Sequence, residues 1–149
     1  MTNKAALTWH HTATPSGPPQ EVIESIRRYH TEERGWVDVA YHLFIDADGR
    51  FWPGRSLDLD PDTHTDLDVR GHIFVAVLGN FEEERPTVAA VESLWWVLRV
   101  LPALFNIPKD RVCPHGNLAE TRCPGRHLLE AHAMKKALCQ VRKKELKGR

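Results

Sequence analysis

The chain has 149 residues and a mass of 17.0 kDa, enough for one hydrophobic core, and we expect a single domain spanning residues 1–149. Hydrophobic residues make up 42% of the chain and charged residues 27%, a balance that excludes a disordered chain and one built of membrane spans. Twenty basic residues balance twenty acidic ones, so no overall positive field favours nucleic acid, and we expect no nucleic-acid partner.

Two features bear on the cellular compartment. The opening MTNKAALTW holds one Lys and no apolar run of signal-peptide length, so we expect a protein made in the cytoplasm, without stable membrane insertion. Cys113, Cys123 and Cys139 form no CxxC pair and are odd in number, which argues against a disulfide framework. One thiolate ligand remains possible, and we expect Cys113 and Cys139 to be small buried hydrophobic residues.

The first half of the chain predicts a strand, a helix and a hairpin. TWHHTAT, residues 8–14, indicates a strand that runs into a polar loop. Two prolines then open a helix that stops at Gly35. Its expected buried face comprises Val22, Ile23, Ile26 and Tyr29. From Val37, VDVAYHLFI predicts a strand, DADGR a turn and FWPGR the second strand of a hairpin.

The second half alternates strands and helices. Residues 58–70 lack periodicity and indicate a surface loop, whereas HIFVAVLGNF predicts a strand buried on both faces, our candidate for the sheet centre. PTVAAVESLWWVLRVLPALFN predicts a long helix with Pro102 as a kink or stop. A short strand in IPKDRVCPHGN, a loop in LAETRCPG and a final helix in RHLLEAHAMKKALCQVRKK follow. This order predicts an α/β domain with helices on the sheet faces.

Charge is unevenly spread along the chain. The C-terminal MKKALCQVRKKELKGR carries seven Lys or Arg against one Glu, which indicates either the solvated face of a helix or contact with an anionic surface. Five aspartates surround His64, but the glycine and terminal glutamate of an EF-hand are missing, so we expect no calcium site.

Nine histidines are present, without an HExxH motif to organise them. A catalytic zinc ion needs three protein ligands from separate elements, and His10, at a strand end, with His115 and Cys123, on a later loop, can meet that need. The alternative is a set of ordinary surface or core histidines. Because strand neighbours point to opposite faces, only one of His10 and His11 can reach such a metal.

Three stretches, HHTAT, RGWVDVAYHLFIDADGR and PHGNLAETRCPG, resemble in order and spacing the type 2 zinc-dependent N-acetylmuramoyl-L-alanine amidases. That family includes short phage endolysins and the peptidoglycan recognition proteins. The resemblance covers residues 7–125 and implies a central mixed sheet of about five strands flanked by about three main helices. It also implies that His10, His115 and Cys123 hold Zn2+, with His11 in a variable position.

The resemblance also assigns roles beside the metal. Tyr41 matches the family's catalytic tyrosine, which stabilises the oxyanion; its alternative role is a strand tyrosine that fills the core. Thr121 stands where phage members often carry lysine and recognition proteins often carry threonine. Its hydroxyl can donate a hydrogen bond to the substrate carbonyl but brings no positive charge, which the adjacent Arg122 can supply.

Substrate contacts are expected from the groove walls. His64 resembles a histidine on the groove rim, or is a solvated loop residue, and Trp52 either stacks on sugar or peptide or packs within the hairpin. Phe74 replaces a residue that is usually small and is expected to alter packing beneath the groove. His42 is expected to be structural.

The function that the resemblance implies is zinc-dependent hydrolysis of the amide between N-acetylmuramic acid and L-alanine in peptidoglycan. The expected setting is a monomeric phage or prophage endolysin, with no separate wall-binding domain, that reaches the wall through a holin. One alternative is a peptidoglycan-binding module without activity, against which the retained Cys123 argues. Others are a cytoplasmic muropeptide-recycling amidase, whose third ligand is usually Asp, and a regulatory protein on the same scaffold.

Overall fold

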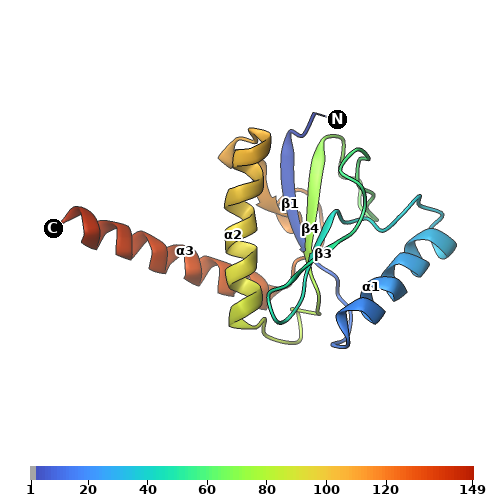
Figure 1. Cartoon of the computed structure of the whole chain (residues 1–149), viewed down its shortest axis with the longest axis horizontal. Coiled ribbons are helices and arrows are strands. Elements are labelled where there is room, and N and C mark those ends of the chain that lie inside the picture. The colour runs from blue at the N-terminus through green and yellow to red at the C-terminus, as the bar shows by residue number, and fades with distance from the viewer. Residues whose placement is uncertain (1–2) are drawn as a thin grey trace.

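Five strands form one mixed sheet with helices on both faces in the computed structural model, which describes residues 3–149 (Figure 1). The strands are β1 (Ala6–His11), β2 (Leu43–Ile45), β3 (Phe51–Pro53), β4 (His72–Val77) and β5 (Val112–Pro114). The main helices are α1 (Pro19–Arg28), α2 (Val88–Phe105) and α3 (Arg126–Lys147). The expected single α/β domain, with a mixed sheet of about five strands and three main helices, is confirmed.

The sheet order is β3-β2-β4-β1-β5, which puts β4 at its centre as expected. The pairs β2–β4, β4–β1 and β1–β5 are parallel, and β3 returns antiparallel to β2 through the predicted hairpin. All six residues of β4 and all six of β1 are buried, as expected of parallel strands covered on both faces.

Alternate residues of β1 and β4 supply two separate cores. Ile73, Val75 and Val77 of β4 pack with Leu94 and the rest of the α2 face. Ala76 instead joins a smaller cluster with Ile23 and Ile26 of α1, Val39 and Phe44. Figure 1 shows α2 and α1 on opposite sides of the sheet.

Helix α2 is the apolar support of the larger core. Thr87 caps its first turn by accepting a hydrogen bond from the amide of Ala90, and Pro102 lies inside the last turn, so the helix continues to Phe105. Among residues 3–149, α2 alone is long and apolar enough to cross a membrane by length and composition. Its packing against the sheet, with Leu94 fully buried, explains that composition.

The strand predicted from Val37 is wrong in its first part, since regular strand begins only at Leu43. Side chains bind much of the backbone before it, and the last residue of that segment, His42, donates its amide to the carbonyl of Phe74 in β4 at 2.9 Å. Arg55 donates to the carbonyls of Val39 and Asp38 at 2.7 and 2.8 Å, and the amide of Ala40 donates to Nδ1 of His30 at 3.0 Å. The segment is therefore held in an irregular path.

The end of the first helix also differs from its prediction. A wider π-helical turn, Tyr29–Glu33, follows α1, and the helical path ends before Gly35, whose φ is +70°. Tyr29 is 44% exposed and is not on the buried face, whereas His30 is 5% exposed. His30 follows Ile26 by four residues, which places it toward the sheet.

Two cysteines are less buried than expected. Cys113 on β5 and Cys139 on α3 are both free thiols of intermediate exposure. Helix α3 packs on the domain near its start, where Leu128 is buried, and then projects from it (Figure 1), and Cys139 on this helix is partly exposed.

Candidate metal centre

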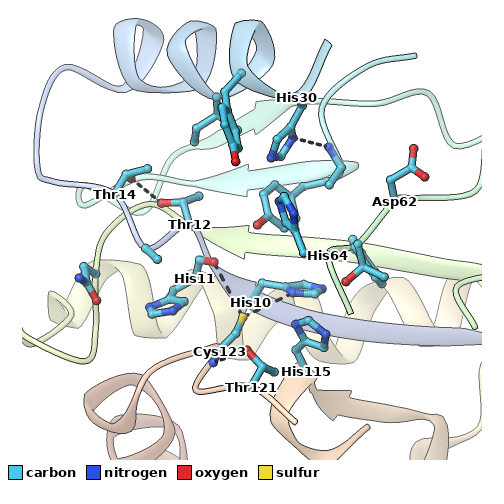
Figure 2. A pocket seen from close by; sticks show the side chains of 18 of the residues that line it. His10, His11, Thr12, Thr14, His30, Asp62, His64, His115, Thr121 and Cys123 are labelled. Carbon is cyan, nitrogen blue, oxygen red and sulfur yellow. Dashed lines mark hydrogen bonds between the residues drawn. The ribbon is translucent and has the colours of Figure 1, made fainter. Parts of the chain in front are cut away.

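An open groove of about 950 Å³ lies on the α1 side of the sheet (Figure 2). Its floor is the end of β1, its far wall is the helical segment around Tyr29 and His30, and its near wall is the loop that carries Cys123. The loop at residues 62–65 closes a third side.

The two adjacent histidines of β1 point in different directions. The His10 ring packs against Phe74 at 4.2 Å, beneath the groove, with Tyr41 at 5.3 Å. The His11 ring turns away, and its Nδ1 accepts the amide of Phe81 at 3.1 Å. Burial lowers the pKa of His11 to about 4, which keeps this acceptor unprotonated. His11 is thus used for structure.

His115 and Cys123 reach His10 from the loop that follows β5. The amide of Gly116 donates to the carbonyl of Cys123 at 2.9 Å, which closes the loop and brings both side chains to one end. Sγ of Cys123 lies 3.5 Å from Nδ1 of His10. One ligand atom from each of the three residues lies within 4.8 Å of the others, and Figure 2 shows the three side chains converging.

The protonation states of this set suit a metal ion. Burial, followed by the proximity of His115, holds the pKa of His10 well below its usual value, and burial lowers the pKa of His115, so both imidazoles are neutral. Burial raises the pKa of the Cys123 thiol to about 12, and a bound cation would have to displace that proton.

The residues present fit zinc. Nε2 of His10 is buried without a hydrogen-bond partner among residues 3–149, an arrangement that a bound ion or water would relieve. Two imidazoles and one thiolate form a donor set that zinc accepts, and all three side chains line the open groove.

Tyr41 lies beside this cluster, in the irregular segment before β2. Its side chain is half-buried and lines the groove, with its ring edge-on to Phe44 at 5.5 Å. Burial, with a further contribution from Cys123, raises the pKa of the Tyr41 hydroxyl above its usual value. The phenol is therefore a neutral hydrogen-bond donor near His10.

Thr121 and Arg122 both line the groove on the Cys123 loop. The Thr121 hydroxyl accepts the amide of Cys123 at 3.2 Å, which leaves its own proton free for another acceptor. Arg122 is exposed.

The two predicted substrate contacts lie in different places. His64 lines the groove and packs against Trp36, at 4.8 Å between ring centroids, and Tyr29, at 6.3 Å. Trp52 is not among the residues that line the groove. Its indole N–H donates to Asp46 at 2.9 Å and its ring packs with the α1 core, so the structure gives it the second of its two expected roles, hairpin packing.

Sequence reasoning missed Thr65 and His30. The Thr65 hydroxyl lies 3.0 Å from Nε2 of His115, which leaves Nδ1 as the free nitrogen of that ring. His30 lines the groove and fixes Ala40 beside Tyr41. The spacing of four residues between Ile26 and His30 predicts that both lie on the same helix face, toward the sheet. No local motif predicts the position of Thr65.

Phe74 and His42 match their expected positions. Phe74 packs beneath His10, where it fills the floor of the groove. His42 is 5% exposed, accepts the amide of Phe74 at Nδ1 and donates to the carbonyl of Leu59 from Nε2. It therefore joins β4 to the loop at residues 58–70.

A family described as N-acetylmuramoyl-L-alanine amidase matches residues 2–126 of the chain. A Sus scrofa protein named N-acetylmuramoyl-L-alanine amidase is 30% identical over 125 residues, which is 78% of this chain. The chain spans only 21% of that relative's length.

Two solved structures share the fold and part of the sequence. One is the endolysin N-acetylmuramoyl-L-alanine amidase LysCS from Clostridium intestinale, with 28% identity, a TM-score of 0.72 and coverage of 91% of this chain and 85% of that one. The other is peptidoglycan recognition protein LE in complex with tracheal cytotoxin, a monomeric peptidoglycan of the diaminopimelic acid type. It has 28% identity, a TM-score of 0.75 and coverage of 87% and 79%.

Proposed function

The chain belongs to the N-acetylmuramoyl-L-alanine amidase family, and from this we propose that it hydrolyses the amide between N-acetylmuramic acid and L-alanine in peptidoglycan, with zinc as its cofactor. The observation that carries the proposal is the convergence of His10, His115 and Cys123 on the floor of an open groove. Nε2 of His10 is one of two histidine nitrogens that are buried without a hydrogen-bond partner in residues 3–149, and His10 is the one that belongs to this convergent set.

The three convergent residues would hold the ion through two neutral imidazoles and one thiolate. When bound there, zinc supplies Lewis acidity that activates water near neutral pH and polarises the amide carbonyl. The chain itself shields this site from bulk water on one side, since Phe74 packs beneath His10.

Tyr41 and Thr121 supply the hydrogen bonds that the reaction needs. The neutral phenol of Tyr41 is placed beside His10 and can donate to the oxyanion that develops on the carbonyl oxygen of the amide. The free proton of the Thr121 hydroxyl can serve the same oxygen from the opposite wall. Addition of the water oxygen to the amide carbon and cleavage of the C–N bond leave a lactyl carboxylate on the glycan, and a proton from the water passes to the leaving amine of L-alanine.

The groove suits a branched polymer better than a small closed-in substrate. It is open along its length, and the rings of Tyr29, Trp36 and His64 gather on one wall, where they offer apolar surface to a stem peptide or sugar. The likeness to a recognition protein bound to a monomeric peptidoglycan supports this class of substrate.

We assign the activity to a phage or prophage lysis enzyme that works as a monomer. The likeness to a clostridial endolysin over most of both chains supports this setting. The enzyme then meets its substrate, the cell wall, after a holin has opened the membrane.

The test is to incubate the purified protein with peptidoglycan, with chelator, and with chelator followed by zinc, and to assay new L-alanine amino termini and new reducing sugars. Amino termini that disappear with chelator and return with zinc are the expected result. New reducing ends would show a glycosidase instead. Sedimentation with the wall and no product at all would favour a binding module, the second candidate, which the likeness to a recognition protein supports.

A further inference from the structure

The second half of α3 serves neither the core nor the groove. The domain holds the start of this helix, where Leu128 is fully buried and the His132 ring packs on Trp9 at 4.7 Å. From Gln140 onward every residue is exposed, and Figure 1 shows the helix projecting away from the sheet. The family match ends at residue 126, so the projecting helix lies outside what the family describes.

Large apolar side chains follow one side of this projecting helix. Met134, Leu138 and Val141 are 68%, 60% and 53% exposed, and their spacing of four and three residues puts them on one face. Ala137 lies between them on the same face, and Glu145, one turn further on, ends the row. We call these four apolar residues the α3 stripe.

Basic residues are frequent on the rest of the helix surface, and one of them, Lys135, forms an ion pair with Glu92 of α2. Residues 135–149 carry Lys135, Lys136, Arg142, Lys143, Lys144, Lys147 and Arg149, with Glu145 as their single acidic residue. At 100° per residue, Lys136, Lys143 and Lys147 lie opposite the α3 stripe, and Arg142 and Lys144 flank it. Residues 1–134 carry thirteen Lys or Arg against nineteen Asp or Glu. The molecule therefore has a cationic arm on an acidic body.

We propose that α3 docks on the surface of an anionic phospholipid membrane. The α3 stripe enters the boundary between headgroups and acyl chains, and the basic side chains beside it extend toward the lipid phosphates. An apolar row bordered by cations is the arrangement that such a surface binds. The acidic body is repelled by the same surface, so the contact is confined to the arm and the groove stays free.

Other occupants fit the helix less well. A second copy of α3 would bring Arg142 and Lys144 of one helix against the same cations of the other, beside a row of only three large side chains. A glycan strand offers phosphate-free, hydrated surface and no hydrocarbon for Met134 and Leu138. A polyanion such as nucleic acid would use the lysines and leave the α3 stripe in water.

The test uses the whole chain with two kinds of vesicle, one of phosphatidylcholine alone and one that also contains phosphatidylglycerol, and measures the bound fraction by sedimentation. We expect binding to the anionic vesicles and little to the neutral ones. The double variant Met134→Gln, Leu138→Gln should lose at least about tenfold in vesicle affinity, because it removes the two most exposed large side chains of the α3 stripe. Leu146→Gln is the matched control: Leu146 is 73% exposed on the same helix but off the stripe, and the variant should bind like the parent chain.

Three results would overturn the proposal. One is a failure of the parent chain to bind anionic vesicles. Another is equal binding by the double variant, which would mean that charge alone attracts the arm. The third is a dimer in sedimentation velocity that the double variant abolishes, which would assign the α3 stripe to a second copy. Circular dichroism of each variant verifies that α3 stays helical, and no readout depends on amidase activity.

Discussion

The two faces of the sheet share the same strands and differ in what covers them. In β1, Leu7 and Trp9 point into a closed apolar core beneath α2, whereas Thr8 and His10, at the alternate positions, point to the side of α1 and the groove. A side chain moved by one residue along β1 would change from one role to the other. Residues of β1 that contribute to the core therefore alternate with residues that face the groove side.

Polar groups on the groove face are tolerated because most of them are paired. The hydroxyl of Thr8 bonds to Nδ1 of His72 at 2.8 Å, and His42 and His30 each accept a backbone amide. Among residues 3–149, Nε2 of His10 is buried without such a partner, and His10 belongs to the candidate metal centre. The comparison therefore predicts that changes in the groove lining alter activity and changes on the α2 face alter stability.

Replacing the thiol of the metal centre should give the largest effect. We expect Cys123→Ser to lower amide hydrolysis by about a thousandfold or more, because a serine hydroxyl is a poor zinc ligand near neutral pH. The free energy of unfolding of the metal-free protein should change by less than about 1 kcal/mol. Product amino termini, zinc content and urea denaturation measure the three quantities.

Cys139→Ser is the control for this substitution, since that thiol lies on α3 and outside the groove lining. It should retain full zinc content and rate. An unchanged rate in Cys123→Ser would show that Cys123 takes no part in the reaction. It would also contradict the assignment of activity to the groove side of the sheet.

The α2 face should respond in the opposite way. Leu94→Ala removes a fully buried side chain from the larger core and should lower the free energy of unfolding by about 3 kcal/mol. The rate per folded molecule should not change. Leu104, 69% exposed on the same helix, provides the control, because Leu104→Ala should cost less than about 0.5 kcal/mol. A lower rate in folded Leu94→Ala would show that the two faces are coupled.

Sequence patterns predicted the parts of the molecule that depend on near neighbours. The apolar run of β4 indicated the sheet centre, and strand alternation separated His10 from His11. The irregular segment before β2 could not be predicted, since its backbone partner Arg55 follows Val39 by 16 residues. The same limit applies more strongly to the metal centre. Its three residues were selected by their type and by family resemblance, and no sequence pattern indicates that Thr65 contacts His115.

His42, which lies outside the groove lining, should make the free energy of unfolding depend on pH. Burial lowers the pKa of His42 to about 4, and protonation at Nδ1 would break its bond from the Phe74 amide. In the unfolded chain the usual value of 6.5 applies, so the unfolded state binds the proton first as the pH falls. The contribution is fully present above pH 6.5 and is lost as the pH falls toward 4, by roughly 3 kcal/mol in total.

His42→Asn tests this directly, because the Asn side-chain oxygen can accept the same amide and cannot be protonated in this range. Urea denaturation between pH 7 and pH 4 should show a shallower loss of stability in the variant than in the parent chain. An identical pH slope would mean that protonation of His42 does not contribute to the loss of stability at low pH. Other histidines would then account for that loss.

The smallest effect is expected for Thr65, which contacts one of the three candidate zinc ligands. The Thr65 hydroxyl holds Nε2 of His115, and its loss in Thr65→Val should weaken zinc affinity by about tenfold, because the ring is then free to turn away from the other two ligands. Chelator competition measures this affinity without any assay of activity. Thr63 is one step further out, since its hydroxyl contacts Thr65 at 3.0 Å, and Thr63→Val should have a smaller effect on zinc affinity. Equal zinc affinity in Thr65→Val and the parent chain would confine the metal centre to its three ligands. A graded loss would instead extend it outward into the loop at residues 62–65, which contacts His115 through Thr65.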